Sequence, residues 1–215
     1  MVSLEERVKQ ERETIQYLEL DVRLWETLNA LSPEDVCRRS LASYDPNVHC
    51  YQVQVLNESY QVFPREMAIH RPHDRDAPLS IELRLLILQY LFQAKELSLA
   101  GNWITEKELK NGEMFYRGVH SLEMFKKPLE EKFGHCPDDF LEAGLSIGGA
   151  KVDHGDMGLK FQILPRIPVL SILWAADDEF PATVHFLFDP TIEHHLALDT
   201  IWGLARVITF KLLEF

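Results

Sequence analysis

The segment LSIELRLLILQYLFQAKE (residues 79–96) constrains the fold more than any other part of the chain, because it is apolar on nearly every side from Leu85 to Phe92. An apolar helix of this kind is stable only when other elements cover it. A chain of 215 residues is long enough to bury such a helix without disulfides or structural metals. The segment therefore predicts a central helix around which the rest of the protein packs.

Runs of β-branched and aromatic residues predict strands on either side of this helix. Two of them, VHCYQVQVL and SYQVFP (residues 48–56 and 59–64), are separated by Asn57-Glu58, the length of a tight hairpin connection. Residues 159–189, LKFQILPRIPVLSILWAADDEFPATVHFLFD, predict a strand, a bend, a second strand, a turn and a third strand. We therefore expect an α+β fold with an antiparallel or mixed sheet packed with helices.

The N-terminal region predicts a long amphipathic helix over residues 4–31, because apolar residues mostly recur there every three or four positions. The Ser-Pro pair at residues 32–33 then supplies the N-cap and first-turn proline of a second helix. The loop HRPHDRDAP (residues 70–78) is the best internal junction, because it contains two prolines and alternating charges. We interpret residues 1–31 as a helical extension and residues 32–215 as a single α+β domain.

Four further helices are predicted after the central one. A short helix is capped by Thr105 with Glu108 three residues later, and a longer helix ends at Gly134. A third follows in PDDFLEAGL (residues 137–145), and the chain closes with an amphipathic helix over residues 198–212.

The charge balance restricts the classes of partner. Acids outnumber bases by 34 to 22, and the net charge of −12 removes the attraction on which binding to nucleic acid and anionic lipid depends. No segment approaches the roughly 20 apolar residues that span a bilayer. The charged start, MVSLEERVKQERETIQ, differs from a secretory signal. We therefore expect a cytoplasmic protein with no nucleic-acid or membrane partner.

The cysteines do not suggest a metal cluster. Cys37, Cys50 and Cys136 are far apart in the sequence and form no C-x-x-C pair. We therefore expect reduced thiols and no iron–sulfur cluster in this chain.

The acids Asp177, Asp178 and Glu179 stand between two predicted strands. In an extended chain Asp177 and Glu179 point to the same side, which would suit a carboxylate pair for acid–base chemistry. A solvated turn is the simpler explanation, since Asp is a preferred turn former. Arg166 lies between two apolar segments and must be paired or face an anionic ligand. Either it pairs with Asp177 or Glu179 in a closed core, or it leaves both facing an open cleft.

Two places suggest metal ligands. His154 and Asp156 lie in the glycine-rich stretch DHGDMG, where the backbone is able to approach a ligand closely. His194 and His195 precede the last helix, and either is a candidate axial ligand for a haem or corrinoid metal. A solvated loop at the first place and helix capping or exposure at the second are the simpler explanations.

Several separated blocks of the chain resemble DUF3786, an uncharacterised domain family of anaerobic bacteria and archaea. These blocks are LLILQYLFQAKELSLAGNWITEKELKNGEMFY (residues 85–116), GGAKVDHGD (148–156), LPRIPVLSILWAADDEFPATVHFLFD (164–189) and, more weakly, YQVQVLNESYQVFP (51–64). The resemblance extends over about residues 35–215. The positions that match these blocks, and that we therefore take as candidate site residues, are Trp103, Glu108, Tyr116, Asp156, Arg166, Asp177, Glu179, Phe180 and Asp189.

The resemblance implies low-potential redox or corrinoid metabolism, because some family members are fused to a four-cysteine iron–sulfur module similar to that of corrinoid iron–sulfur proteins. This chain has no such cysteine set, so a cluster is expected on a partner protein. We therefore expect a non-catalytic accessory or cofactor-binding protein that recognises a corrinoid, another tetrapyrrole, or a corrinoid or iron–sulfur protein partner. Its cleft is expected near Arg166, Asp156 and the acids at 177–179.

Two other functions remain open at this point. A metal-assisted hydrolase or lyase would use the carboxylates of Asp156, Asp177 and Glu179. A protein-interaction module would instead dock its partner through the N-terminal helix, residues 1–31. Carboxylates that converge within reach of one ion would favour the enzyme, and acids turned into solvent would argue against it.

Overall fold

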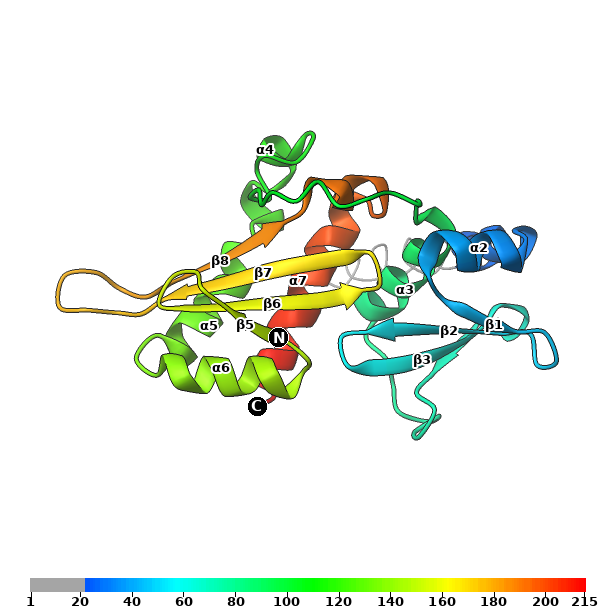
Figure 1. Ribbon diagram of the computed structural model, residues 1–215, viewed down its shortest axis with the longest axis horizontal. Coiled ribbons are helices and arrows are strands. Elements are labelled where there is room, and N and C mark those ends of the chain that lie inside the picture. The colour runs from blue at the N-terminus through cyan, green and yellow to red at the C-terminus, as the bar shows by residue number, and fades with distance from the viewer. Residues whose placement is uncertain (1–21) are drawn as a thin grey trace, which may run out of the picture.

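The computed structural model describes residues 22–215, which Figure 1 shows as a coloured ribbon. This part of the chain forms helices and two four-stranded antiparallel sheets, so the predicted α+β class is confirmed. The two sheets lie next to each other across the molecule (Figure 1). Of the predicted N-terminal helix, residues 22–30 are helical, and the preceding residues lie outside the described part.

The first sheet has the strand order β1-β2-β3-β4. Val55 pairs with Glu58, so the turn between β2 and β3 consists of Leu56 and Asn57, one residue earlier than predicted. Apolar residues that alternate with glutamines along β2 bury one face of this sheet. Its strands are β1 (Ser43–Asp45), β2 (Cys50–Val55), β3 (Glu58–Phe63) and β4 (Ala68–His70).

The second sheet has the order β5-β6-β7-β8, with β5 (Ala150–Val152), β6 (Met157–Leu164), β7 (Ile167–Trp174) and β8 (Thr183–Phe188). Strand β7 is buried along its whole length except at Trp174, because β6 and β8 flank it. Arg166 lies in the turn before β7, and Asp177 lies in the turn after it. An eight-residue strand is about 26 Å long, so these two turns are at opposite ends of the sheet.

Helix α3 (Ile81–Gln93) is the predicted central helix, and its apolar residues are buried on most sides. The Ser80 hydroxyl accepts a hydrogen bond from the Leu83 N–H at 3.3 Å and caps its first turn. α3 packs against the C-terminal helix α7 (Leu198–Leu213) and against α2 (Pro33–Ser40). The remaining helices are α4 (Gly112–Phe115), α5 (Glu123–Phe133) and α6 (Pro137–Ser146), with short 3-10 turns η1 (Pro64–Glu66), η2 (Gly118–His120) and η3 (Pro190–His194). None of the helices within residues 22–215 is long and apolar enough to cross a membrane.

The turn between β2 and β3 joins the two sheets. The Leu56 N–H donates to the Ile163 carbonyl at 3.0 Å, and the Asn57 side chain donates to the Ser146 carbonyl at 2.9 Å. Buried residues from both sheets and from the helices form one continuous hydrophobic core.

The segment between α3 and α4 crosses the molecule as an extended chain along its upper edge (Figure 1). Ile104 exchanges backbone hydrogen bonds of 2.9 and 2.8 Å with Phe188, which ties the segment to the end of β8. The predicted short helix after Thr105 is therefore wrong: residues 106–111 form turns. The capping contact itself is present, because the Glu108 carboxylate accepts from the Thr105 N–H and hydroxyl, both at 2.8 Å, and closes a single turn.

Candidate functional site

Arg166 and the acids of the β7–β8 loop do not meet, because β7 separates them. The Arg166 guanidinium instead donates to the carbonyls of Arg39 at 2.5 Å and Arg38 at 3.2 Å, at the C-terminal end of α2. Its backbone N–H donates to the Tyr90 hydroxyl, which donates to the Ser40 carbonyl at 2.7 Å. The predicted cleft that unites Arg166 with the acids is therefore wrong. Arg166 instead binds the free carbonyls at the C-terminal end of α2.

Asp156 fastens the glycine-rich turn between β5 and β6 to the end of β7. Its carboxylate accepts a 2.8 Å hydrogen bond from the Ala175 N–H. Gly155 has a φ of +63°, and a Cβ at this position would lie 2.4 Å from a methyl group of Ile172. The stretch DHGDMG is thus a tight turn that needs glycine for close packing. His154, the other predicted ligand here, is exposed.

Asp177 organises the loop between β7 and β8. Its Oδ1 accepts hydrogen bonds from the backbone N–H groups of Glu179 at 2.8 Å and Phe180 at 2.7 Å. These donors stabilise the ionised carboxylate and hold the pKa of Asp177 below its usual range. The sequence suggested either a carboxylate pair or a solvated turn for these acids. The hydrogen bonds of Asp177 are those of a turn.

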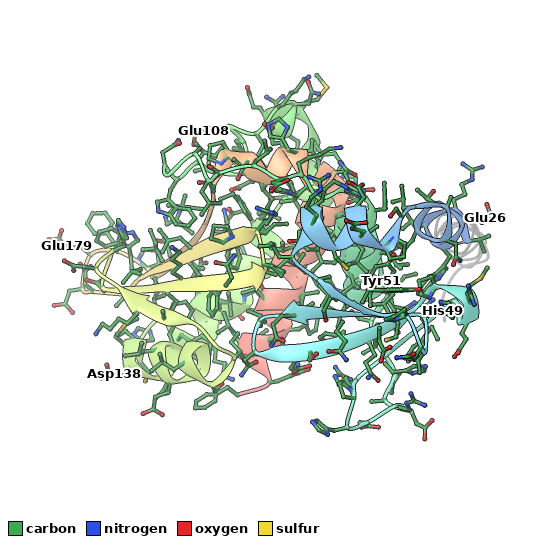
Figure 2. The ribbon with its side chains drawn as sticks, turned by 45° about the vertical axis from the view of Figure 1, so that its right-hand side comes forward. Glu26, His49, Tyr51, Glu108, Asp138 and Glu179 are labelled. Carbon is green, nitrogen blue, oxygen red and sulfur yellow. The ribbon has the colours of Figure 1, made fainter. Side chains whose placement is uncertain are left out.

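The same loop forms one wall of a surface hollow of about 480 Å³ against α5, which we call the acidic hollow. The Ala176 N–H donates to the Gly134 carbonyl at 2.9 Å and holds the loop against the helix. Figure 1 shows the β7–β8 loop projecting beyond the rest of the molecule, and Figure 2 shows Glu179 at its outer edge. The hollow is lined by Glu130, Glu131, His135, Ala176, Asp177, Asp178, Glu179, Phe180, Pro181 and Ala182.

Two large aromatic side chains are exposed near this hollow. Phe180, on its rim, is 66% exposed, and Trp174, at the end of β7, is 50% exposed. Glu130 is partly used within the fold, since its carboxylate accepts from the Val184 N–H at 2.9 Å. Within residues 22–215, the carboxylates of Glu131, Asp178 and Glu179 have no ion-pair or hydrogen-bond partner. The hollow thus presents free acids beside the exposed ring of Phe180.

Sequence reasoning missed the contribution of α5 to this hollow. Glu130 and Glu131 come from a charged helical stretch that is typical of any solvated helix face, and they are about 45 residues from the loop. Only the packing of α5 against β8 brings the two acid groups together.

Trp103, Glu108 and Tyr116 do not line the acidic hollow. Tyr116 is a core residue whose hydroxyl donates to the Leu198 carbonyl at 3.0 Å, and burial raises its pKa. Trp103 is partly exposed, with the Lys160 ammonium 6.0 Å from its ring centre. Glu108 is exposed and closes the turn after Thr105. The structure therefore separates these three predicted cofactor contacts.

Asp189 is a buried carboxylate with a structural role. It accepts hydrogen bonds from the N–H groups of Ala100, Gly101 and Thr191 and from the Thr191 hydroxyl, at 2.6 to 3.1 Å. Burial alone would raise the pKa of Asp189, but these donors lower it overall. The residue ties the crossing segment to the start of η3.

Of the two histidines before α7, the buried His195 does not fit the role of an axial ligand to a tetrapyrrole metal. His195 is 1% exposed, and its Nδ1 accepts a 3.2 Å hydrogen bond from the Lys95 N–H. Burial, and secondarily the charge of Arg166, lower the pKa of His195 to about 4. His194 is exposed, and neither ring lines the acidic hollow. An axial histidine needs one ring nitrogen open to its metal, which the buried His195 does not provide, whereas for the exposed His194 this role stays a prediction.

The predicted metal ligands do not converge either. Within residues 22–215, no group of three or more His, Cys, Asp or Glu side chains is arranged to hold a metal ion. His154 and Asp156 contribute one exposed ring and one carboxylate that already accepts a backbone N–H.

A groove of about 330 Å³ beside α7 is lined by side chains of both charges, and each of its three cations is paired with an acid. Arg206 pairs with Glu82, and Lys211 and Arg71 pair with Glu58. Burial raises the pKa of Glu58, but these bonds outweigh it and lower that pKa to about 2. The groove therefore has little positive charge left for an anionic ligand.

The family model for DUF3786, described as a domain of unknown function, matches residues 32–211. The chain belongs to the DUF3786 family. No curated protein and no solved structure gives a significant match. All residues of the acidic hollow lie inside the DUF3786 region, whereas the helix at residues 22–30 precedes it.

Proposed function

We propose that this DUF3786 protein is a non-catalytic accessory protein that docks a positively charged surface of a partner protein into the acidic hollow. The observation that carries the proposal is the convergence of five carboxylates, from Glu130, Glu131 and residues 177–179, around one hollow. Opposite charge at an interface speeds association and selects the partner. A net charge of −12 adds long-range attraction for a basic partner.

The exposed aromatic rings support a docking role over simple solvation of the loop. Phe180 projects from the rim of the hollow, and Trp174 lies at the end of the adjoining strand. Aromatic side chains are common energetic centres of protein interfaces, and their faces attract Lys and Arg cations. A Lys or Arg side chain would therefore meet both a carboxylate and a ring at this place.

We take the kind of partner from the family resemblance in the sequence, which implies redox or corrinoid metabolism. We extend the proposal to a partner that carries the corrinoid or the iron–sulfur cluster. Of the two candidate axial histidines, the buried His195 already accepts the Lys95 N–H, so we assign the tetrapyrrole to the partner rather than to this chain. The proposed role is then to hold or position the cofactor-bearing protein.

The alternatives receive less support from the site. A metal-assisted hydrolase or lyase would need Asp156, Asp177 and Glu179 around one ion, yet the first two carboxylates accept backbone N–H groups in different turns. Docking through the N-terminal helix depends mainly on residues 1–21, which lie outside the described part of the chain.

The proposal is tested with a triple variant that neutralises the free acids of the hollow, namely Glu131→Gln, Asp178→Asn and Glu179→Gln. The probe is a short peptide of alternating Arg and Gly residues, and its affinity is measured by calorimetry at low and moderate salt. We expect the triple variant to bind at least about tenfold more weakly, because each exposed charge pair contributes up to about 1 kcal/mol.

A second triple variant serves as the charge-matched control: Asp76→Asn, Glu142→Gln and Glu214→Gln. These acids are exposed and lie outside the hollow. At moderate salt, the control should bind the peptide within about twofold of the natural protein, since salt screens charges that lie far from the bound peptide. Equal losses in both variants would show that net charge alone attracts the peptide, and the docking proposal would then be abandoned.

A further inference from the structure

A second hollow, of about 240 Å³, lies between the helix at residues 22–30 and the first sheet, and we call it the Tyr44–His49 pocket. Figure 2 shows His49 and Tyr51 close together on this side of the molecule, near the helix that carries Glu26. The pocket is lined by Leu28, Asn29, Leu31, Pro33, Tyr44, His49, Tyr51, Pro64 and Arg65.

The charge of this pocket is opposite to that of the acidic hollow. Among residues 22–215, no carboxylate lines it, although the chain carries 34 acids. Its cation is Arg65, which is exposed and has no ion-pair or hydrogen-bond partner within residues 22–215. The cations of the groove beside α7, by contrast, are matched with Glu58 and Glu82. An unpaired guanidinium is therefore available to an anion at this position.

His49 supplies a second polar contact from a fixed position. It ends the loop between β1 and β2 with a φ of +50°, in the left-handed region that a turn usually fills with Gly or Asn. The Tyr44 hydroxyl lies 2.9 Å from His49 Nδ1. With Tyr44 as donor to Nδ1, the ring proton is on Nε2, which becomes a hydrogen-bond donor for a ligand.

The remaining walls suit a flat apolar body. The rings of Tyr44 and Tyr51 lie 4.7 Å apart, and Leu28, Pro33 and Pro64 complete the wall. The volume equals that of about eight water molecules at roughly 30 Å³ each, which suits a single ring that bears one acidic group.

We propose that the Tyr44–His49 pocket binds a small aromatic carboxylate. The ligand carboxylate accepts hydrogen bonds from the Arg65 guanidinium and from His49 Nε2, and the ligand ring packs against Tyr44 and the two prolines. Charged hydrogen bonds of this kind are the strong ones, so the anion decides recognition and the ring adds apolar contact. The proposal is independent of the acidic hollow, because the two hollows share no lining residue.

The test is a titration of the full-length protein with benzoate, followed by the ring resonances of His49 in NMR spectra, with benzamide as the uncharged analogue. We expect saturable shifts of the His49 and Tyr44 signals with benzoate and at least about tenfold weaker binding of benzamide, because loss of the ionic partner removes the charge-assisted bonds. Absence of saturable shifts with benzoate, or equal affinity for benzamide, would overturn the proposal.

His49→Asn separates binding from folding, because Asn accepts a positive φ at least as well as His does. We expect this variant to keep the thermal midpoint of the natural protein and to bind benzoate about tenfold more weakly. Arg65→Gln should weaken benzoate binding similarly. Arg117→Gln is the matched control, since Arg117 is exposed on the distant α4 side and pairs with Glu113, and it should bind normally. Unchanged affinity in both pocket variants would contradict the assignment.

Discussion

The two ends of β7 use their polar groups in opposite ways. At the Arg166 end, a guanidinium, the Tyr90 hydroxyl and the carbonyls at the end of α2 satisfy one another inside the fold. At the other end, the loop that Asp177 organises directs the free carboxylates of Asp178 and Glu179 into solvent. A structural clamp and an open acidic surface thus lie at the two ends of one strand, about one strand length apart.

This difference teaches that charge near a strand end does not by itself indicate function. A charged group whose hydrogen bonds are all made within the protein contributes to folding, whereas a cluster of unpaired like charges beside exposed rings has binding capacity left. Substitutions at the Arg166 end should therefore change the free energy of unfolding, and substitutions at the acidic end should change binding.

Arg166→Met should give the largest effect. Methionine replaces the aliphatic part of the Arg166 side chain but has no guanidinium. The carbonyls of Arg38 and Arg39 therefore lose their donors. We expect the free energy of unfolding, measured by urea denaturation, to fall by about 2 to 3 kcal/mol. Binding of the Arg-Gly peptide to the acidic hollow should stay unchanged in the folded variant.

Arg166→Lys distinguishes the geometry of this clamp from its charge. A single ammonium group cannot reproduce the two-point contact of the guanidinium, so Lys should restore at most part of the lost stability. Full restoration by Lys, or no loss in the Met variant, would show that the clamp is not what stabilises this end of the hairpin.

The pH dependence of stability should give the next largest effect, through His195 at the same end. Its pKa is lowered to about 4 in the folded protein, against about 6.5 for an unfolded chain. The unfolded state therefore takes up the proton first, and stability is lost as the pH falls from about 6.5 towards 4. We expect His195 to account for a loss of about 2 kcal/mol over this range, measured by denaturation at several pH values.

The control for this prediction is His185→Asn, because His185 is exposed on β8. It should retain the loss of stability between pH 6.5 and 4, whereas His195→Asn should reduce it. An NMR titration that places the pKa of His195 in the folded protein near 6.5 would contradict the prediction directly.

Much of this fold follows from local sequence patterns. The apolar helix α3, the hairpin of β2 and β3 and the three strands from β6 to β8 follow from periodicity and turn residues, which act over short distances. The separation of the strands into two sheets does not follow from these patterns. It depends on long-range contacts such as the bond from the Leu56 N–H to the Ile163 carbonyl. The short helix expected after Thr105 failed because Ile104 pairs with β8 and Glu108 closes only one turn.

The candidate site was predictable only in its local part. The acids at 177–179 were visible as a turn, and Asp177 does shape that turn through backbone N–H groups. The position of Arg166 at the far end of β7 follows from the hairpin topology that the sequence predicted, although the expected cleft placed it with the acids. Glu131 was not predictable, since only the packing of α5 brings it to the loop.

Asp177→Asn should cost less stability than the changes at the Arg166 end, because the carboxylate is exposed even though it accepts two backbone N–H groups. We expect a small drop in the thermal midpoint at neutral pH, smaller than that of Arg166→Met. The drop should vanish in acid, since the lowered pKa of Asp177 stabilises the fold only while the natural carboxylate is ionised.

Glu179→Gln should leave the midpoint unchanged and weaken peptide binding, because its carboxylate has no partner within residues 22–215. If Asp177→Asn costs as much stability as Arg166→Met, the acidic end is also a clamp, and its charge would no longer favour a docking surface.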